Sequence, residues 1–172
     1  AFAKKYPERF VEMGVAEQNM ASVAAGMSLM GKVPYIASYA TFSPGRNWEQ
    51  IRTTIAYNDA NVKIAGAHAG VSVGPDGATH QATEDLAIMR AMPNMKVFSP
   101  CDAWEAKKAT YAAAKIYGPC YLRFAREKTP VFTTEATPYE IGKAQTFWLE
   151  PDGSKPDVAI IACGPLVHNA IL

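Results

Sequence analysis

The sequence lacks an excess of charge of either sign, because 17 Lys and Arg stand against 16 Asp and Glu, for a formal charge of +1. A global field for nucleic acid or an anionic membrane is therefore excluded, and partners have to be recognised by local sites. No apolar run approaches the ~18 residues that a membrane helix needs, and the first residues do not resemble a signal peptide. We therefore expect a cytoplasmic protein with no nucleic-acid or membrane partner.

Cysteine is also scarce. Cys101, Cys120 and Cys163 are widely spaced and form no CxxC pair, so neither a disulfide framework nor a zinc site is indicated, and buried free thiols are expected. Hydrophobic residues make up 49% of the chain and charged residues 19%, which is ordinary globular usage. The length of 172 residues suits one domain of ~150 residues with a little left over.

Short β-rich runs alternate with segments of helical spacing, which predicts an α/β fold with a mostly parallel sheet covered by helices. Runs such as VKIAGA and CYLRFA read as buried parallel strands. The expected strands or strand-plus-loop units are Val33 to Phe42, Val62 to Val73, Met95 to Ser99 and Cys120 to Phe124; the expected helices are Val15 to Met30, Asn47 to Tyr57, His80 to Met92 and Ala103 to Tyr117. Ligands of such folds bind at the carboxyl edge of the sheet.

The pattern changes after residue 128. Residues 129–156 are rich in Pro, Thr, Gly and charge, and predict a linker. Val158 to Ala162 then reads as a fresh buried strand that leads into a helix. A strand and half a helix cannot bury a core, so we expect residues 157–172 to begin a second domain.

Glu17 is the first residue that points to chemistry. It lies at the start of a predicted helix, in line with Met20, Ala24 and Met27, so its carboxyl group falls on the apolar stripe. Such a Glu can merely interact with the helix N-terminus, where negative charge is favoured. Alternatively, burial keeps the carboxyl group neutral, so that it can share a proton with a ligand nitrogen.

Aromatic side chains close the first predicted strand. Tyr39 and Phe42 precede the turn Ser43-Pro44-Gly45-Arg46. They can form core at the rim of the sheet, or they can stack on a planar ring.

The run from His68 to Asp85 combines glycine with ionisable groups. His68, Asp76 and His80 lie among Gly70, Gly74 and Gly77. Such a loop at the carboxyl end of a strand can hold and protonate a polar substrate, although an Asp-Gly pair also serves plain turn geometry. A metal site is disfavoured, since the two histidines are twelve residues apart and lack i, i+4 pairing.

Arginines end the fourth predicted strand. Arg126 follows the strand at the same edge, where it can grip a phosphate or form a rim salt bridge. Arg123 lies within the strand and is expected to be structural.

Four motifs in this order, GVAEQNM, SYATF, GPDGATHQ and LRFAR, make residues 10–130 resemble the pyrimidine-binding domain of the transketolase family of thiamine diphosphate enzymes. VAIIACGPLVHNA is similar to the opening of the family's carboxyl-terminal domain. The resemblance implies a three-layer αβα fold, with a pyrimidine domain over residues 1–128 that lacks its first strand and helix, a linker over residues 129–156, and the start of the carboxyl-terminal domain over residues 157–172.

The resemblance also implies roles for single residues. Glu17 matches the glutamate that hydrogen-bonds the aminopyrimidine ring of thiamine diphosphate, and Phe42 matches the aromatic residue that stacks on this ring. Tyr39 and Arg46 lie beside Phe42 and are weaker cofactor contacts. His80 matches a histidine placed for proton transfer and for hydrogen bonding to the donor sugar. The remaining matches, to donor-hydroxyl and substrate-phosphate contacts, are Asp76, His68 and Arg126.

The family's magnesium and diphosphate signature, GDG with a downstream Asn, is absent from the sequence. The resemblance therefore implies that a diphosphate-binding amino-terminal domain or subunit supplies the Mg²⁺ site, in a dimer or a heterotetramer, and that this chain is inactive without it. The implied reaction moves a two-carbon ketol unit between sugar phosphates. Alternatives are the pyrimidine domain of deoxyxylulose-phosphate synthase and a non-catalytic scaffold, while the β subunit of a 2-oxoacid dehydrogenase fits poorly.

Overall fold

Four parallel strands form the central sheet of the computed structural model, which describes residues 2–151 and 153–172. Their order is β1-β2-β4-β3, and each strand lies within one of the four predicted segments: β1 Tyr35–Tyr39, β2 Lys63–Ala67, β3 Lys96–Phe98 and β4 Cys120–Arg123. Residues 1 and 152, which the predicted domain and linker ranges include, lie outside the described residues. The prediction of a parallel α/β sheet is confirmed.

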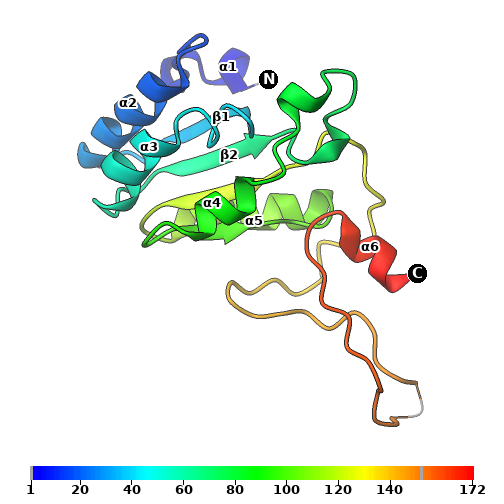
Figure 1. Ribbon diagram of the computed structural model, residues 1–172. Coiled ribbons are helices and arrows are strands. Elements are labelled where there is room, and N and C mark those ends of the chain that lie inside the picture. Colours follow the sequence, from blue (N-terminus) through cyan, green and yellow to red (C-terminus); the bar gives the residue numbers. More distant parts are fainter. Residues whose placement is uncertain (1, 152) are drawn as a thin grey trace.

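Helices connect these strands (Figure 1). They are α1 Phe2–Lys5, the 3₁₀ turn η1 Pro7–Arg9, α2 Glu17–Leu29, α3 Trp48–Gln50 with the π-helical turn η2 Ile51–Ala56, the 3₁₀ turns η3 Val71–Val73 and η4 Ala78–His80, α4 Asp85–Arg90, α5 Ala103–Lys115 and α6 Leu166–Ile171. The helix predicted from His80 begins only at Asp85. The reason is that the Gly70 N–H donates to the Ala82 carbonyl at 2.8 Å and ties the chain back before the helix can start.

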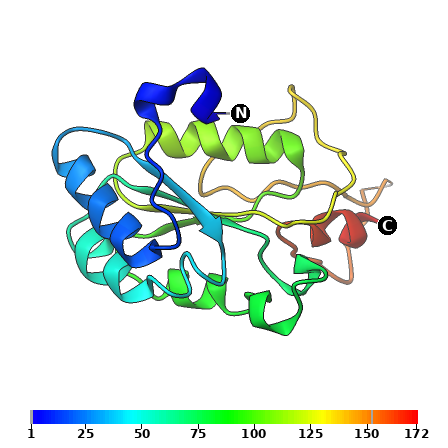
Figure 2. The ribbon, with the colours of Figure 1, turned by 90° about the horizontal axis from the view of Figure 1, so that it is seen from above.

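The helices cover both faces of the sheet, so the αβα layering is confirmed. Figure 2 shows α5 on one face and α2, α3 and α4 on the other. Alternate residues of β4 fill the two cores, since Tyr121 packs under α2 and α4 and Leu122 packs under α5. Side chains of a strand alternate between faces, and this alternation places the polar residues of each strand on a defined side.

Helix α2 packs closely against the sheet because its inner face is built from small residues. Ala21, Ala24 and Ala25 are buried there against Ile36 of β1. Glu17, the first residue of the helix, lies on this same buried side and is 6% exposed. The predicted stripe is therefore present, and it carries the carboxyl group into the interior.

The segment after residue 128 leaves the sheet in a long excursion before it returns to α6 (Figure 1). The strand predicted over Val158 to Ala162 is absent, because no described strand pairs with it, and Ile161 is 94% exposed. Cys163 is exposed, contrary to the expectation of three buried thiols, whereas Cys101 and Cys120 are buried.

Among the described residues, we find no helix with both the length and the apolar character that crossing a bilayer requires.

Candidate active site

Four of the predicted site residues, Tyr39, Phe42, His68 and His80, lie together at the carboxyl edge of the sheet. The neighbouring strands β2 and β4 send the chain to opposite faces at this edge. After β2 the chain passes to α4 on one face of the sheet. After β4 it passes to the start of α5 on the other face, where Asp102 Oδ2 accepts the N–H groups of Phe132 and Thr133 at 3.0 and 2.7 Å. Ligands of open parallel sheets bind at such switch points, outside the carboxyl ends of the strands.

Four rings meet at this edge. Tyr39 ends β1, and its ring centroid lies 4.3 Å from that of His68, which directly follows β2. Phe42 and His80 meet edge to face at 5.3 Å, and Tyr39 lies 6.2 Å from Phe42. The structure thus brings together aromatic groups from the β1–α3 connection and imidazole groups from the β2–α4 connection. We call Tyr39, Phe42, His68 and His80 the ring cluster.

Glu17 joins this cluster through Arg46. The Arg46 Nη1 donates to Glu17 Oε2 at 3.1 Å. The same guanidinium lies over the Phe42 ring, 4.7 Å from its centroid. The Arg46 guanidinium therefore contacts the Glu17 carboxylate and covers the Phe42 ring face, the two groups that the resemblance assigns to a bound pyrimidine. The Arg46 side chain itself is 47% exposed.

Asn47 fixes the start of α2, and sequence reasoning missed it. Its buried amide Nδ2 donates to the Glu17 carbonyl at 3.0 Å and to Ser43 Oγ at 3.2 Å. These bonds tie the helix that carries Glu17 to the turn that carries Phe42. An Asn at the start of a predicted helix is too common a pattern to have revealed this role.

The glycine-rich segment places its histidines unequally. His80 ends η4, where its Nδ1 lies 2.8 Å from Thr79 Oγ1. His68 has a φ of 55°, which is uncommon for a non-glycine residue, and its buried Nδ1 has no hydrogen-bond partner within the described chain. A buried nitrogen without a partner costs free energy unless a ligand or water satisfies it.

The two remaining predicted substrate contacts lie apart from the rings. Arg126 Nη1 donates to the Val73 carbonyl at 2.8 Å, so the guanidinium is bound to the glycine-rich segment itself. Asp76 is exposed, and its carboxylate makes no hydrogen bond or ion pair to any residue that the structure describes. The structure therefore does not join Asp76 to the ring cluster.

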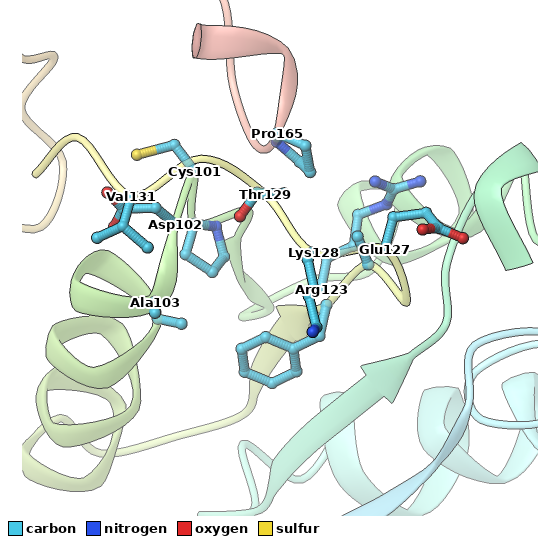
Figure 3. Close-up of a pocket in the computed structure, with 13 residues that line it drawn as sticks. Cys101, Asp102, Ala103, Arg123, Glu127, Lys128, Thr129, Val131 and Pro165 are labelled. Carbon is cyan, nitrogen blue, oxygen red and sulfur yellow. The ribbon is translucent and has the colours of Figure 1, made fainter.

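A separate cleft of about 420 Å³ lies between β4, the start of α5 and the returning carboxyl-terminal segment (Figure 3). Its walls are mainly apolar, with Cys101, Val131 and Pro165 among them. None of the predicted site residues lines it. Arg123 links it to the site, because this residue also forms an ion pair with Asp85 beneath the glycine-rich segment.

No group of three His, Cys, Asp or Glu side chains within residues 2–151 and 153–172 has the arrangement of a metal site.

An open parallel sheet that carries a carboxylate, rings and imidazoles at its carboxyl edge defines an α/β protein of the class whose ligands bind at that edge. The family described as "Transketolase, pyrimidine binding domain" matches residues 1–131, and this chain belongs to it. The enzymes of this family are thiamine diphosphate-dependent transferases.

Individual relatives agree with this assignment. A "Putative transketolase C-terminal section" from Methanocaldococcus jannaschii is 45% identical over 99% of this chain and 53% of its own length. One of the subunits of an apulose-4-phosphate transketolase from Phocaeicola vulgatus is 37% identical over 98% of this chain and 53% of its own length. A solved "Split gene transketolase, inactive beta4 tetramer" is 48% identical, with a TM-score of 0.75 over 83% of this chain and 45% of the solved chain.

The chain thus spans about half the length of these relatives.

Proposed function

We propose that this chain is the carboxyl-terminal part of a thiamine diphosphate-dependent transketolase, which moves a two-carbon ketol unit between sugar phosphates. The observation that carries the proposal is the meeting of the buried Glu17 with the ring cluster, because family membership alone does not require the site to be retained. The names of the relatives, a carboxyl-terminal section and a transketolase subunit, support the same conclusion.

The residues present fit the aminopyrimidine half of thiamine diphosphate. Glu17 offers a buried carboxyl group and Phe42 offers a ring face, which suit a ring nitrogen and an aromatic plane. Both are engaged by the planar guanidinium of Arg46. A bound pyrimidine would therefore displace this side chain toward solvent, where nearly half of it already lies.

The cofactor, when bound, supplies the carbanion chemistry and the electron sink. In this proposal, Glu17 hydrogen-bonds the ring nitrogen and holds or shares its proton. His80 lies against the Phe42 ring and transfers a proton to or from an oxygen of the donor sugar. The buried Nδ1 of His68 is open to a polar ligand. Asp76 is assigned to a donor hydroxyl, and Arg126 to a substrate phosphate once its bond to Val73 opens.

The other half of the site is proposed to come from a diphosphate-binding amino-terminal subunit or domain. It would carry the Mg²⁺ that holds the diphosphate, in a dimer or a heterotetramer, and this chain would not turn over alone. Near-neutral charge agrees with this division, because anionic substrates would then be held by a few placed residues and the partner's metal.

The domain division and the location belong to the same proposal. Residues 1–128 would form the pyrimidine domain, 129–156 a linker and 157–172 the start of a further domain. The support is that the core clusters fall within residues 21–122. A cytoplasmic location is proposed from the three free thiols.

The test is to produce the protein with its diphosphate-binding partner and assay it with thiamine diphosphate and Mg²⁺. Xylulose 5-phosphate with ribose 5-phosphate should give a seven-carbon ketose phosphate. Pyruvate with glyceraldehyde 3-phosphate should give no product, and release of CO₂ from this pair would instead establish the synthase. A complex that binds thiamine diphosphate but turns over neither pair would establish the scaffold.

A further inference from the structure

A polar unit lies beneath the glycine-rich segment, on residues to which the proposed function gives no role. Asp85 is the first residue of α4 and is 1% exposed. Its Oδ2 accepts the Tyr121 hydroxyl at 2.7 Å and Arg123 Nε at 2.9 Å. Both donors come from β4, so the unit joins the central strand to the end of the segment that carries His68 and His80.

The sheet is built to admit this unit. A Cβ on Gly66 in β2 would lie 2.2 Å from the Tyr121 hydroxyl oxygen, so the ring can cross β2 only where that residue is glycine. Burial and the neighbouring Asp85 raise the pKa of Tyr121 above its ordinary value. The phenol therefore stays protonated and donates to the carboxylate.

Arg123 lies between Asp85 and the backbone of the glycine-rich segment. A Cβ on Gly70 would lie 3.0 Å from Arg123 Nη2, and Gly70 has a φ of 84°, so the guanidinium lies directly against the backbone there. On either side, the Ala69 N–H donates to the Phe124 carbonyl at 3.0 Å and the Gly70 N–H to the Ala82 carbonyl at 2.8 Å. This backbone leads directly into His68.

We propose that Asp85, Tyr121 and Arg123 are positioning residues that hold the backbone at Ala69 and Gly70 and thereby set the place of the His68 ring against Tyr39. They touch no reacting atom. The effect on turnover rests on the proposed function, but the effect on the segment does not.

Stability alone is a poor reason for this unit. A buried ion pair carries a desolvation cost that its attraction barely offsets, and an apolar replacement is often as stable. Asp85 Oδ1 is moreover buried without a partner within the described chain, so the unit is incompletely satisfied. The hydrogen bonds of Asp85 instead restrict the motion of the segment that lies over it, at Ala69 and Gly70.

The experiment compares Asp85→Asn with Asp102→Asn in the complex with the diphosphate-binding partner. Asp102 is a matched control because it is a buried carboxylate that holds a different segment, at Phe132 and Thr133. Amide hydrogen exchange at Ala69 and Gly70 should rise at least about tenfold in Asp85→Asn. In Asp102→Asn, the increase should appear at Phe132 and Thr133 and leave Gly70 unchanged.

A milder variant covers the risk that Asp85→Asn fails to fold. Tyr121→Phe keeps the ion pair and should raise exchange at Gly70 about threefold. Unchanged exchange at Gly70 in the folded variants, or an equal rise at all strand amides, would overturn the proposal.

The kinetic readout separates positioning from general destabilisation. In Asp85→Asn, KM for the ketose phosphate donor should rise about tenfold, with kcat and the affinity for thiamine diphosphate changed much less. Loss of kcat without a change in KM would contradict the positioning role. If the wild-type complex shows no ketol transfer, the proposed function fails, while the exchange experiment still decides the present inference.

Discussion

Two sets of buried polar groups, one at each end of the parallel sheet, differ in how completely their hydrogen bonds are satisfied. At the amino end, the Lys63 Nζ is fully buried and donates to Asn61 Oδ1 at 2.7 Å and to the carbonyls of Ile116 and Gly118 at 2.9 and 2.7 Å. Each ammonium proton has an acceptor. At the carboxyl end, the buried His68 Nδ1 has no hydrogen-bond partner within the described chain. The Glu17 carboxylate there is paired with Arg46, whose side chain is about half exposed.

This difference separates a structural centre from a binding centre. A closed set of hydrogen bonds leaves nothing for a ligand and serves the fold, whereas a buried ring nitrogen without a partner and a displaceable cation leave bonds for a ligand to complete. Changes at the carboxyl end should therefore alter activity and ligand binding, and changes at the amino end should alter stability.

Glu17→Gln should give the largest effect. In the complex with the partner, ketol transfer should fall by at least about 10²-fold, because the amide cannot hold or share the proton. The free energy of unfolding should change by less than ~1 kcal/mol, since the lost ion pair is to a half-exposed arginine. Steady-state kinetics and urea unfolding measure the two quantities. Near-wild-type turnover would remove Glu17 from the site.

Lys63→Met should reverse this pattern. Three acceptors, one of them on the buried Gly118, lose their donor. The free energy of unfolding should therefore fall by about 3 kcal/mol, while turnover per folded molecule stays unchanged. Lys96→Met is the control at the same end, because the one hydrogen bond described for Lys96 Nζ is to the exposed Asn94 carbonyl at 3.3 Å. Loss of activity at full stability in Lys63→Met would break the distinction between the two ends.

Arg46→Ala tests whether its side chain competes with the cofactor or binds it. If the guanidinium stands in the place of the pyrimidine, removing it should tighten thiamine diphosphate binding about threefold, as expected for a partly exposed ion pair. Isothermal titration gives the affinity directly. Arg52→Ala is the control, since Arg52 stacks over Trp48 at 5.7 Å outside the ring cluster. Weaker binding in Arg46→Ala would restore the sequence-based role of Arg46 as a cofactor contact.

A pH effect on the free energy of unfolding is expected from Lys63. Burial lowers the pKa of Lys63, and the nearby Cys120 only partly opposes this shift. Between the lowered pKa and its ordinary value, the unfolded chain binds more protons at this residue than the folded chain, so the free energy of unfolding rises with pH. The difference between wild type and Lys63→Met, measured by urea unfolding across this alkaline window, should show that rise. A difference that is flat or falls with pH would contradict it.

The sequence predicted local features of both ends and missed the contacts between distant residues. Strand positions followed from apolar runs, and the burial of Glu17 followed from helical spacing. VKIAGA was interpreted as apolar on both faces, but the acceptors that allow Lys63 into it lie 53 and 55 residues further along the chain. Likewise, nothing in SPGR indicates that Arg46 pairs with a carboxylate 29 residues earlier.

The later part of the chain shows a second limit. Val158 to Ala162 has the composition of a buried strand, but composition does not supply a neighbour, and the segment stays unpaired. The helix expected from His80 was shortened for a related reason. The carbonyl of Ala82, within the expected helix, accepts a hydrogen bond from the Gly70 N–H, and no local sequence pattern predicts this contact.

The order of the strands bears on how the chain acquires its shape during synthesis. β3 pairs with β4 in the described sheet, and β4 lies between β2 and β3. Translation releases the amino-terminal part first, so β1, β2 and α2 can associate before β4 has been synthesised. Until then β3 has no strand to pair with. The backing of the His68 segment comes from Phe124 and Arg123. The half of the site that carries Glu17 can therefore assemble on the ribosome before the half that carries the histidines.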